Sequence, residues 1–200
     1  MKKTLLLSIL AALLLGCTNQ TKQTNDVENM DKDFLTLATE RYSVRHFSDK
    51  PVEQEKIDKI LRAAQVAPTA VNSQPQMIYL LRSAEAMEKA NEVSPCMYGA
   101  PQAFLVCYDT ERACQRGDNG NYGDIDCSII ITHMMLEAAD LGLGTCAVGM
   151  FDVQKTIEAF NLPANIRPVL MLPFGYPAAD AQPSDRHSEY RPLEETVKEL

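Results

Sequence analysis

The chain has 200 residues, of which 46% are hydrophobic, so it is long enough for one domain with a packed core. Its formal net charge is −8 and no basic patch stands out, which argues against a nucleic-acid partner, because such partners require clustered Lys and Arg. An acidic total still allows a local basic pocket that binds a phosphate group.

The first residues differ in character from the rest of the chain. Lys2 and Lys3 precede an apolar run over Leu5–Leu15, which is shorter than the roughly 20 residues that span a bilayer. A basic start, a short apolar run and a small residue before Cys17 are typical of a signal peptide. The ending Leu-Leu-Gly-Cys resembles the lipobox of bacterial lipoproteins, which implies acylation of Cys17. An ordinary signal peptide or an uncleaved anchor is the alternative.

This interpretation divides the chain into three parts. Residues 1–16 are the predicted lipoprotein signal peptide, residues 17–32 a polar tether that starts at acylated Cys17, and residues 33–200 the folded domain. The tether lacks a repeating apolar pattern, as flexible linkers do. The mature protein is then expected to be anchored to a membrane by its lipid, on the periplasmic or cell-surface side.

Helices and short apolar strands alternate along the rest of the chain. We expect helices over Asp33–Glu40, Glu53–Ala67, Ala84–Asn91, Asp124–Leu141 and Val153–Phe160, and strands over Met77–Leu81, Ala103–Tyr108 and within Arg167–Gly175. This alternation predicts an α+β fold, arranged as an α/β sandwich. The last 25 residues are polar and contain Pro177, Pro183 and Pro192, so we expect an extended tail. The helix over Asp124–Leu141 is apolar nearly all round, which predicts a place in a core or an interface.

Five cysteines follow Cys17, and an odd number leaves at least one thiol unpaired within the chain. The sequence has no CxxC and no Cys/His cluster, so we expect no metal site. Cys107 and Cys127 lie in apolar runs and are expected to be core thiols. Cys96 and Cys114 lie in loop-like stretches and could pair in an exported protein.

Arg41, Ser43 and Arg45 stand at alternate positions just after a predicted helix. In an extended segment their side chains project to one side, where two guanidiniums and a hydroxyl can bind a phosphate. The spacing alone fits a polar strand face exposed to solvent at least as well as it fits a phosphate site.

Two further stretches carry candidate binding residues. Asn72 and Gln74 offer amides that donate and accept, as the polar edge of a flavin requires, although the stretch taken alone favours a turn built on Pro and Asn. The glycines of Gly142-Leu-Gly144 and Gly149 end the long helix and permit close approach of a flat group. They do not match GxGxxG and they follow a helix rather than a strand, so a Rossmann fold is excluded.

Together and in this order, these segments resemble the nitroreductase family. The resemblance runs through Arg41-x-Ser43-x-Arg45-x-Phe47, Asn72-Ser73-Gln74-Pro75, Gly142-Leu-Gly144-Thr-Cys146, Pro173-Phe-Gly175-Tyr-Pro177 and Arg191-Pro192-Leu193-Glu194-Glu195. It implies a mixed sheet flanked by helices, an intertwined homodimer, and FMN at the dimer interface with residues from both chains.

The resemblance also implies roles for individual residues. Arg41, Ser43 and Arg45 would hold the phosphate and ribityl chain, with backbone contacts from Tyr42, and Arg191 would close on the phosphate. Asn72 and Gln74 would lie beside the ring, and backbone groups of Ala147, Val148 and Gly149 would face its N5 atom. Glu189 and Tyr190 replace a basic pair that close relatives often have, so Arg186 or His187 would have to compensate. No catalytic side chain is expected, because the flavin carries the chemistry.

The implied activity is two-electron reduction of nitroaromatic or quinone-like acceptors with NAD(P)H as the usual donor. An exported protein lies outside the NAD(P)H pool, which favours another donor. A surface-anchored flavin-binding electron carrier without turnover is the alternative function. Family branches with different chemistry usually carry lid insertions, and residues 110–123 are the one short candidate here. A chain that no longer binds FMN is the remaining alternative.

Overall fold

The computed structural model of the chain describes residues 33–118 and 120–200. The predicted signal peptide, the lipid-modified Cys17 and the tether lie outside the described residues. Within them, no helix is both long enough and apolar enough to cross a membrane.

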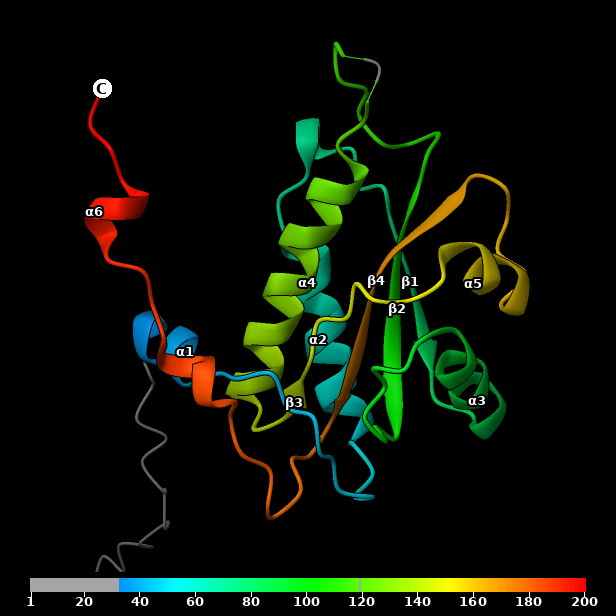
Figure 1. Cartoon of the computed structure of the whole chain (residues 1–200). Coiled ribbons are helices and arrows are strands. Elements are labelled where there is room, and N and C mark those ends of the chain that lie inside the picture. Colours follow the sequence, from blue (N-terminus) through cyan, green and yellow to red (C-terminus); the bar gives the residue numbers. More distant parts are fainter. Residues whose placement is uncertain (1–32, 119) are drawn as a thin grey trace, which may run out of the picture. The chain divides into compact units, whose positions relative to one another are not determined.

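Four strands form one sheet in the order β1-β2-β4-β3 (Figure 1). They are β1 (Gln76–Leu81), β2 (Gln102–Asp109), β3 (Gly144–Thr145) and β4 (Ile166–Gly175). The neighbouring strands pair antiparallel, and in the described part of the chain a parallel pairing occurs at the isolated bridge between Ser43 and Thr145. The predicted α+β class is confirmed, and the sheet is mixed through this bridge.

Helices cover both faces of the sheet. As a result β2 is buried along nearly its whole length, and its side chains alternate between two hydrophobic cores. Phe104, Val106 and Tyr108 pack with α2 (Gln54–Val66) and α4 (Gly123–Asp140), whereas Leu105 and Cys107 pack with α3 (Ala84–Val93) and α5 (Val153–Ala159) (Figure 1). The rings of Phe104 and Phe174 stack at 4.4 Å between centroids and join β2 to β4 in the first core.

The helices follow the apolar spacing of the sequence. Ile57, Ile60 and Ala64 of α2 are buried, as their i, i+3, i+7 spacing predicts. The shorter α1 (Phe34–Glu40) begins where the Asp33 carboxylate accepts a hydrogen bond from the backbone N–H of Thr36.

One side of α4 is buried and the other is partly open. Its buried positions include Cys127, Ile130, Ile131, Met134 and Ala138, while Ile125 is 43% exposed. The sequence predicts that α4 lies in a core or an interface. The sheet and α2 bury one side of the helix, which fulfils this expectation for that side. On the opposite side, α1 contacts the C-terminal half of α4, while the first turns around Ile125 stay open.

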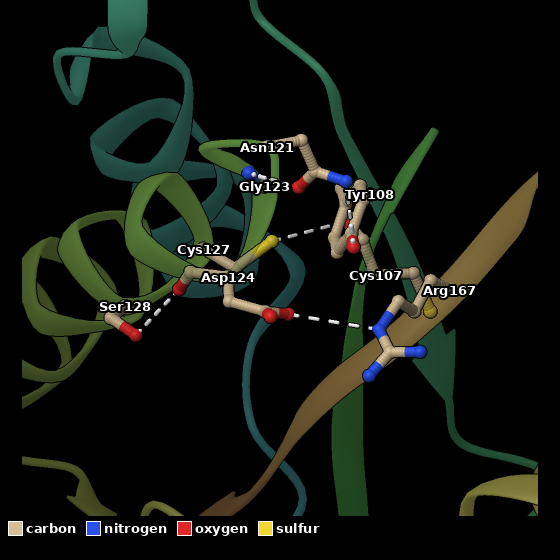
Figure 2. A network of polar contacts seen from close by, with 8 residues as sticks. All are labelled: Cys107, Tyr108, Asn121, Gly123, Asp124, Cys127, Ser128 and Arg167. Atoms are coloured by element: carbon tan, nitrogen blue, oxygen red, sulfur yellow. Dashed lines mark hydrogen bonds and ion pairs between the residues drawn. The ribbon is translucent and has the colours of Figure 1, made fainter. Parts of the chain in front are cut away.

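The start of α4 is fixed by close packing and polar contacts with β2 and β4 (Figure 2). The helix begins at Gly123, where any side chain would collide with the Tyr108 ring, and the Asn121 side chain accepts a hydrogen bond from the Gly123 N–H at 2.9 Å. Cys127 Sγ lies 3.4 Å from the Cys107 carbonyl oxygen, and Asp124 lies 3.9 Å from Arg167. The predicted core positions of Cys107 and Cys127 are thus confirmed.

The other thiols within residues 33–118 and 120–200 are free as well. Cys96 is buried and Cys114 is half-buried, with its Sγ near the Gln115 carbonyl oxygen. The alternative of a Cys96–Cys114 disulfide is not realised in the structure.

The tail is less extended than its prolines suggest. Two short helical turns occur in it, η2 (Asp185–Ser188) and α6 (Leu193–Thr196). Ser184 accepts a hydrogen bond from the Arg186 N–H and so begins η2. Apart from these two turns, the tail is mostly exposed and without regular structure, in line with an extended tail rather than a packed element.

Candidate functional site

The segment Arg41–Arg45 lies against β3 and against the turn that follows α4 (Figure 1). Val44 donates its backbone N–H to the Thr145 carbonyl oxygen at 2.9 Å and its side chain is buried. Because neighbouring side chains in extended backbone point to opposite sides, burial of Val44 turns Ser43 and Arg45 outward.

A basic hollow of about 280 Å³ opens beside this segment. It is lined by Tyr42, Ser43, Arg45, Ser184, Arg186 and His187. No carboxylate lines the hollow, although Glu189 lies 3.9 Å from Arg186 Nε at its edge. The tail is held here because His187 Nε2 lies 3.1 Å from the Thr39 carbonyl oxygen and its ring meets the Tyr42 ring edge-on at 6.2 Å. Two guanidiniums with two hydroxyl groups form a donor set suited to a phosphate.

The thiol of Cys146 lies under the same segment. Burial raises its pKa, whereas Arg45, a hydrogen bond from Ser43 and Arg41 act in the opposite direction. Ser43 and Arg45 line the hollow, whereas Arg41 lines a neighbouring depression of about 230 Å³, so the role of Arg41 at a phosphate stays a prediction. Arg45 also lies 5.8 Å from the centre of the Tyr98 ring.

The amides of Asn72 and Gln74 lie on a strained loop between α2 and β1. The loop includes the short turn η1 (Ala70–Asn72), and φ is positive at Val71 (48°), Asn72 (55°) and Gln74 (46°). Such conformations cost about 1–3 kcal/mol each in residues other than glycine and cluster at functional sites. Gln74 Nε2 donates to Asn72 Oδ1 at 3.0 Å, so the two amides already form a pair.

The two groups of predicted residues lie at opposite ends of α4. Ala70 donates its N–H to Asp126 in the first turn of α4, whereas Thr145 follows the last turn (Figure 1). The 18 residues of α4 give a helix about 27 Å long. One chain therefore brings Ser43 and Arg45 together at one end of α4 but keeps Asn72 and Gln74 at the other end.

The turn after α4 offers fewer free backbone groups than expected. The N–H and the carbonyl oxygen of Val148 both bond with Met171 of β4, at 2.8 and 2.9 Å. Ala147 and Gly149 on either side are exposed. The Val148 N–H is thus taken up by the sheet, whereas the contacts expected of the backbone groups of Ala147 and Gly149 stay predictions.

Arg191 lies away from the basic hollow in this chain. Its Nε lies 3.3 Å from the Glu195 carboxylate, and its side chain is 70% exposed. The tail contributes Ser184, Arg186 and His187 to the hollow, and the last two are the residues that the sequence offers as compensation for Glu189 and Tyr190. The role of Arg191 stays a prediction.

Comparisons with known proteins bear on this arrangement. The sequence model described as "Nitroreductase family" matches residues 38–96 and 94–176. The chain belongs to the nitroreductase family. A family member from Methanothermobacter thermautotrophicus, provisionally named NADH dehydrogenase/NAD(P)H nitroreductase, is 36% identical over 73% of this chain and 78% of its own length. The "FMN reductase [NAD(P)H]" of Bacillus subtilis is 31% identical over 73% of this chain, which spans 66% of that protein.

A solved structure of this family has the same fold. The crystal structure of a nitroreductase family protein from Clostridium difficile is similar with a TM-score of 0.79 and 38% identity, over 84% of this chain and 98% of that chain. The resemblance to the nitroreductase family that the motifs predict is therefore confirmed.

Some residues near the site have no role in the sequence-based prediction. Asp126, Ser184 and Tyr98 reach the site regions through tertiary contacts. A signal existed for Asp126, since it is a carboxylate on the buried side of an apolar helix. The positions of Ser184 and Tyr98 depend on how the tail and the loop after α3 fold, and no local pattern marks them.

Proposed function

We propose that the chain is an FMN-dependent oxidoreductase of the nitroreductase type, which passes two electrons to small acceptors such as nitroaromatics and quinone-like compounds. The names of the family members support the enzyme class and the cofactor, since they include NAD(P)H nitroreductase and FMN reductase. The observation that carries the proposal is the basic hollow with Arg45 and Arg186 on its walls.

The residues of the hollow fit the phosphate end of FMN. Arg45 and Arg186 supply charge-assisted donors, while Ser43 and Ser184 add hydroxyl groups. The rest of the cofactor would extend toward Ala147 and Gly149, which are exposed and have a small side chain or none. When bound, FMN supplies the two-electron chemistry at its N5 atom. The protein holds the phosphate, orients the ring with amides and leaves one face open to small molecules.

The distance between the two ends of α4 supports a homodimer. The length of α4 exceeds that of an extended FMN molecule, so the loop of Asn72 and Gln74 cannot serve the hollow of its own chain. A second copy packed antiparallel along the open side of α4 would place its loop at this hollow. That side carries a depression of about 550 Å³ lined by Asp124, Ile125, Ser128, Ile129, Thr132 and His133. Each of the two sites would then be built from both chains.

Export and lipid anchoring are part of the proposal. They are supported by Lys2, Lys3, the apolar run and the lipobox-like ending at Cys17. Residues 17–32 would then tether a domain of residues 33–200 on the periplasmic or cell-surface side of a membrane. Metabolic labelling with a radioactive fatty acid tests this: the wild type should take up label and Cys17→Ser should not.

The location bears on the electron donor. Family names point to NAD(P)H, whereas an exported domain does not meet that pool, so we propose that the physiological donor is a quinol or a protein. Stopped-flow reduction of the FMN-loaded protein should be slow with NADH and NADPH at physiological concentrations. Fast reduction with a low KM would overturn this part and assign NAD(P)H as the donor.

A direct experiment tests the central proposal. Purified protein should show a flavin absorption spectrum, or take up added FMN with quenching of its fluorescence, and then reduce a nitroaromatic over many cycles with an artificial donor. Flavin binding without turnover would favour the electron carrier. A colourless protein that takes up no FMN would refute the cofactor site.

A further inference from the structure

We propose that Asp126 is a positioning residue for the flavin site, because its carboxylate holds the loop that presents Asn72 and Gln74. This inference rests on the proposed function, because it takes FMN as the ligand of Asn72 and Gln74. The tie between Asp126 and the loop is independent of any ligand.

The contact joins two different elements. Asp126 lies in the first turn of α4 and is 1% exposed. Its Oδ1 accepts a hydrogen bond from the backbone N–H of Ala70 at 2.9 Å. Ala70 opens η1, so Asp126 fixes the beginning of the loop, while the N–H of Asp109 fixes its end through the Pro75 carbonyl oxygen at 2.8 Å.

The loop needs such ties because its own backbone is strained. The positive φ angles at Val71 and Gln74 oppose the preferences of these residues, most of all at β-branched Val71, whereas Asn72 tolerates this conformation more readily. The Gln74 N–H bonds with Thr69 Oγ1 at 3.0 Å, which keeps the loop closed but does not attach it to the rest of the domain. A strained segment persists when its surroundings fix it, and the bond to Asp126 fixes this loop to the longest helix.

The polar surroundings of Asp126 are unusual for a core. In residues 33–118 and 120–200, the buried side-chain atoms without a protein partner are Ser73 Oγ, Gln76 Oε1 and Asp126 Oδ2. Gln76 pairs with Tyr108 across the β1–β2 ladder, so both side chains face α4, where Tyr108 contacts Gly123. The three atoms thus belong to the loop, its continuation into β1 and its tie to α4.

The carboxylate carries a cost as well as a gain. One of its buried oxygens has no protein partner, whereas its place in the first turn of α4 is favourable. An apolar residue would leave the Ala70 N–H without its acceptor and release the loop. A role in holding Asn72 and Gln74 in their geometry explains why a carboxylate occupies position 126.

Three variants of the full chain test the proposal. Asp126→Ala removes the acceptor, Asp126→Asn keeps an acceptor oxygen, and Ala70→Pro removes the donor without altering the core. Proline is compatible there because Thr69 has the extended backbone (φ −130°, ψ 157°) that residues before proline adopt. Two quantities are measured: FMN affinity by fluorescence titration, and hydrogen–deuterium exchange of the peptide over residues 69–76 without FMN.

Asp126→Ala and Ala70→Pro should each weaken FMN binding about tenfold and accelerate exchange in the loop. Asp126→Asn should stay within about threefold of the wild type. The double variant of Asp126→Ala with Ala70→Pro should bind FMN no more weakly than either single variant, because both substitutions break the same hydrogen bond.

The matched control is Cys127→Ala, which alters the next residue of the same helix. Cys127 is fully buried and contacts Cys107 rather than the loop. It should lower the melting temperature yet leave FMN affinity and loop exchange unchanged. Wild-type affinity and exchange in both Asp126→Ala and Ala70→Pro would overturn the proposal, and so would equal losses in Cys127→Ala. If the wild type binds no FMN, the proposed function fails, while exchange in the apo protein still decides whether Asp126 holds the loop.

Discussion

The side chain of Val44 covers Gly144, and a Cβ built on Gly144 would lie 2.5 Å from Val44 Cγ2. Gly144 opens β3, and the next residue, Thr145, accepts the backbone hydrogen bond from Val44. The basic segment is therefore seated on the sheet by a contact that a single methyl group would prevent.

Gly144→Ala should displace the segment of Ser43 and Arg45. Overpacking of this kind costs about 1–3 kcal/mol, so both the free energy of unfolding and the FMN affinity should fall. Urea unfolding and fluorescence titration measure the two effects. Adding Val44→Ala to Gly144→Ala makes room for the new methyl group and should recover part of both; a double variant no better than the single one would speak against the packing explanation.

Arg45→Ala should weaken FMN binding about 10- to 100-fold, because it removes charge-assisted hydrogen bonds to a phosphate. The matched control is Arg167→Ala, which removes an exposed arginine that lies 3.9 Å from Asp124 at the other end of α4. Titration at two salt concentrations should show a weaker salt dependence in Arg45→Ala only. Equal affinities for the two variants would exclude Arg45 from the phosphate site.

The tail allows a comparison of two arginines. Arg186 lines the hollow with Arg45, whereas Arg191 pairs with Glu195. Arg186→Ala should weaken FMN binding roughly three- to tenfold, since its exposed charge is screened by solvent, and Arg191→Ala should have the smaller effect. The opposite order would support the role that the family resemblance implies for Arg191.

Ile125→Asp should prevent dimer formation by placing a charge on the open side of α4. Light scattering after size exclusion should give a monomer mass, and FMN affinity should drop with it because each site would lose the partner's loop. Val153→Asp provides the control, since Val153 is 37% exposed on α5, on the other face of the sheet. A dimeric Ile125→Asp protein would place the interface elsewhere.

The buried thiol of Cys107 predicts a loss of stability at alkaline pH. Burial raises its pKa from about 9 to about 12, so the folded state keeps a proton that the unfolded state releases. Its contribution to stability is complete below about pH 9 and declines as pH rises toward 12, by about 1.4 kcal/mol per pH unit at most. Urea unfolding at pH 8 and pH 10 should show a smaller decline in Cys107→Ala. Identical declines would show that other groups cause the loss.

Much of the fold could be predicted because its elements carry local patterns. Ile57, Ile60 and Ala64 mark α2 by their spacing, and the apolar run over Ala103–Tyr108 marks the strand that became β2. The two-residue strand β3 could not be found this way. Gly144 and Thr145 are extended because β4 and the segment of Ser43 pair with them, and such partners are distant in sequence.

The candidate site likewise has features that local sequence patterns predict and features that depend on contacts between distant parts of the chain. The alternate spacing of Ser43 and Arg45 predicted that both face one side, and both line the hollow, because backbone geometry alone sets the direction of these side chains, whereas Arg41 lines a separate depression. Their separation from Asn72 and Gln74 depends on the length and placement of α4, which no motif encodes. The same applies to Val148, whose backbone groups are taken up by Met171 of β4.

The separation of the two residue groups along α4 has a genetic consequence for a dimer with shared sites. One allele that loses Arg45 and another that loses Gln74 would each give homodimers with two defective sites. In a mixed dimer, one pocket would collect both lesions and the other would be assembled from intact parts. Two null alleles expressed in the same cell would then complement each other.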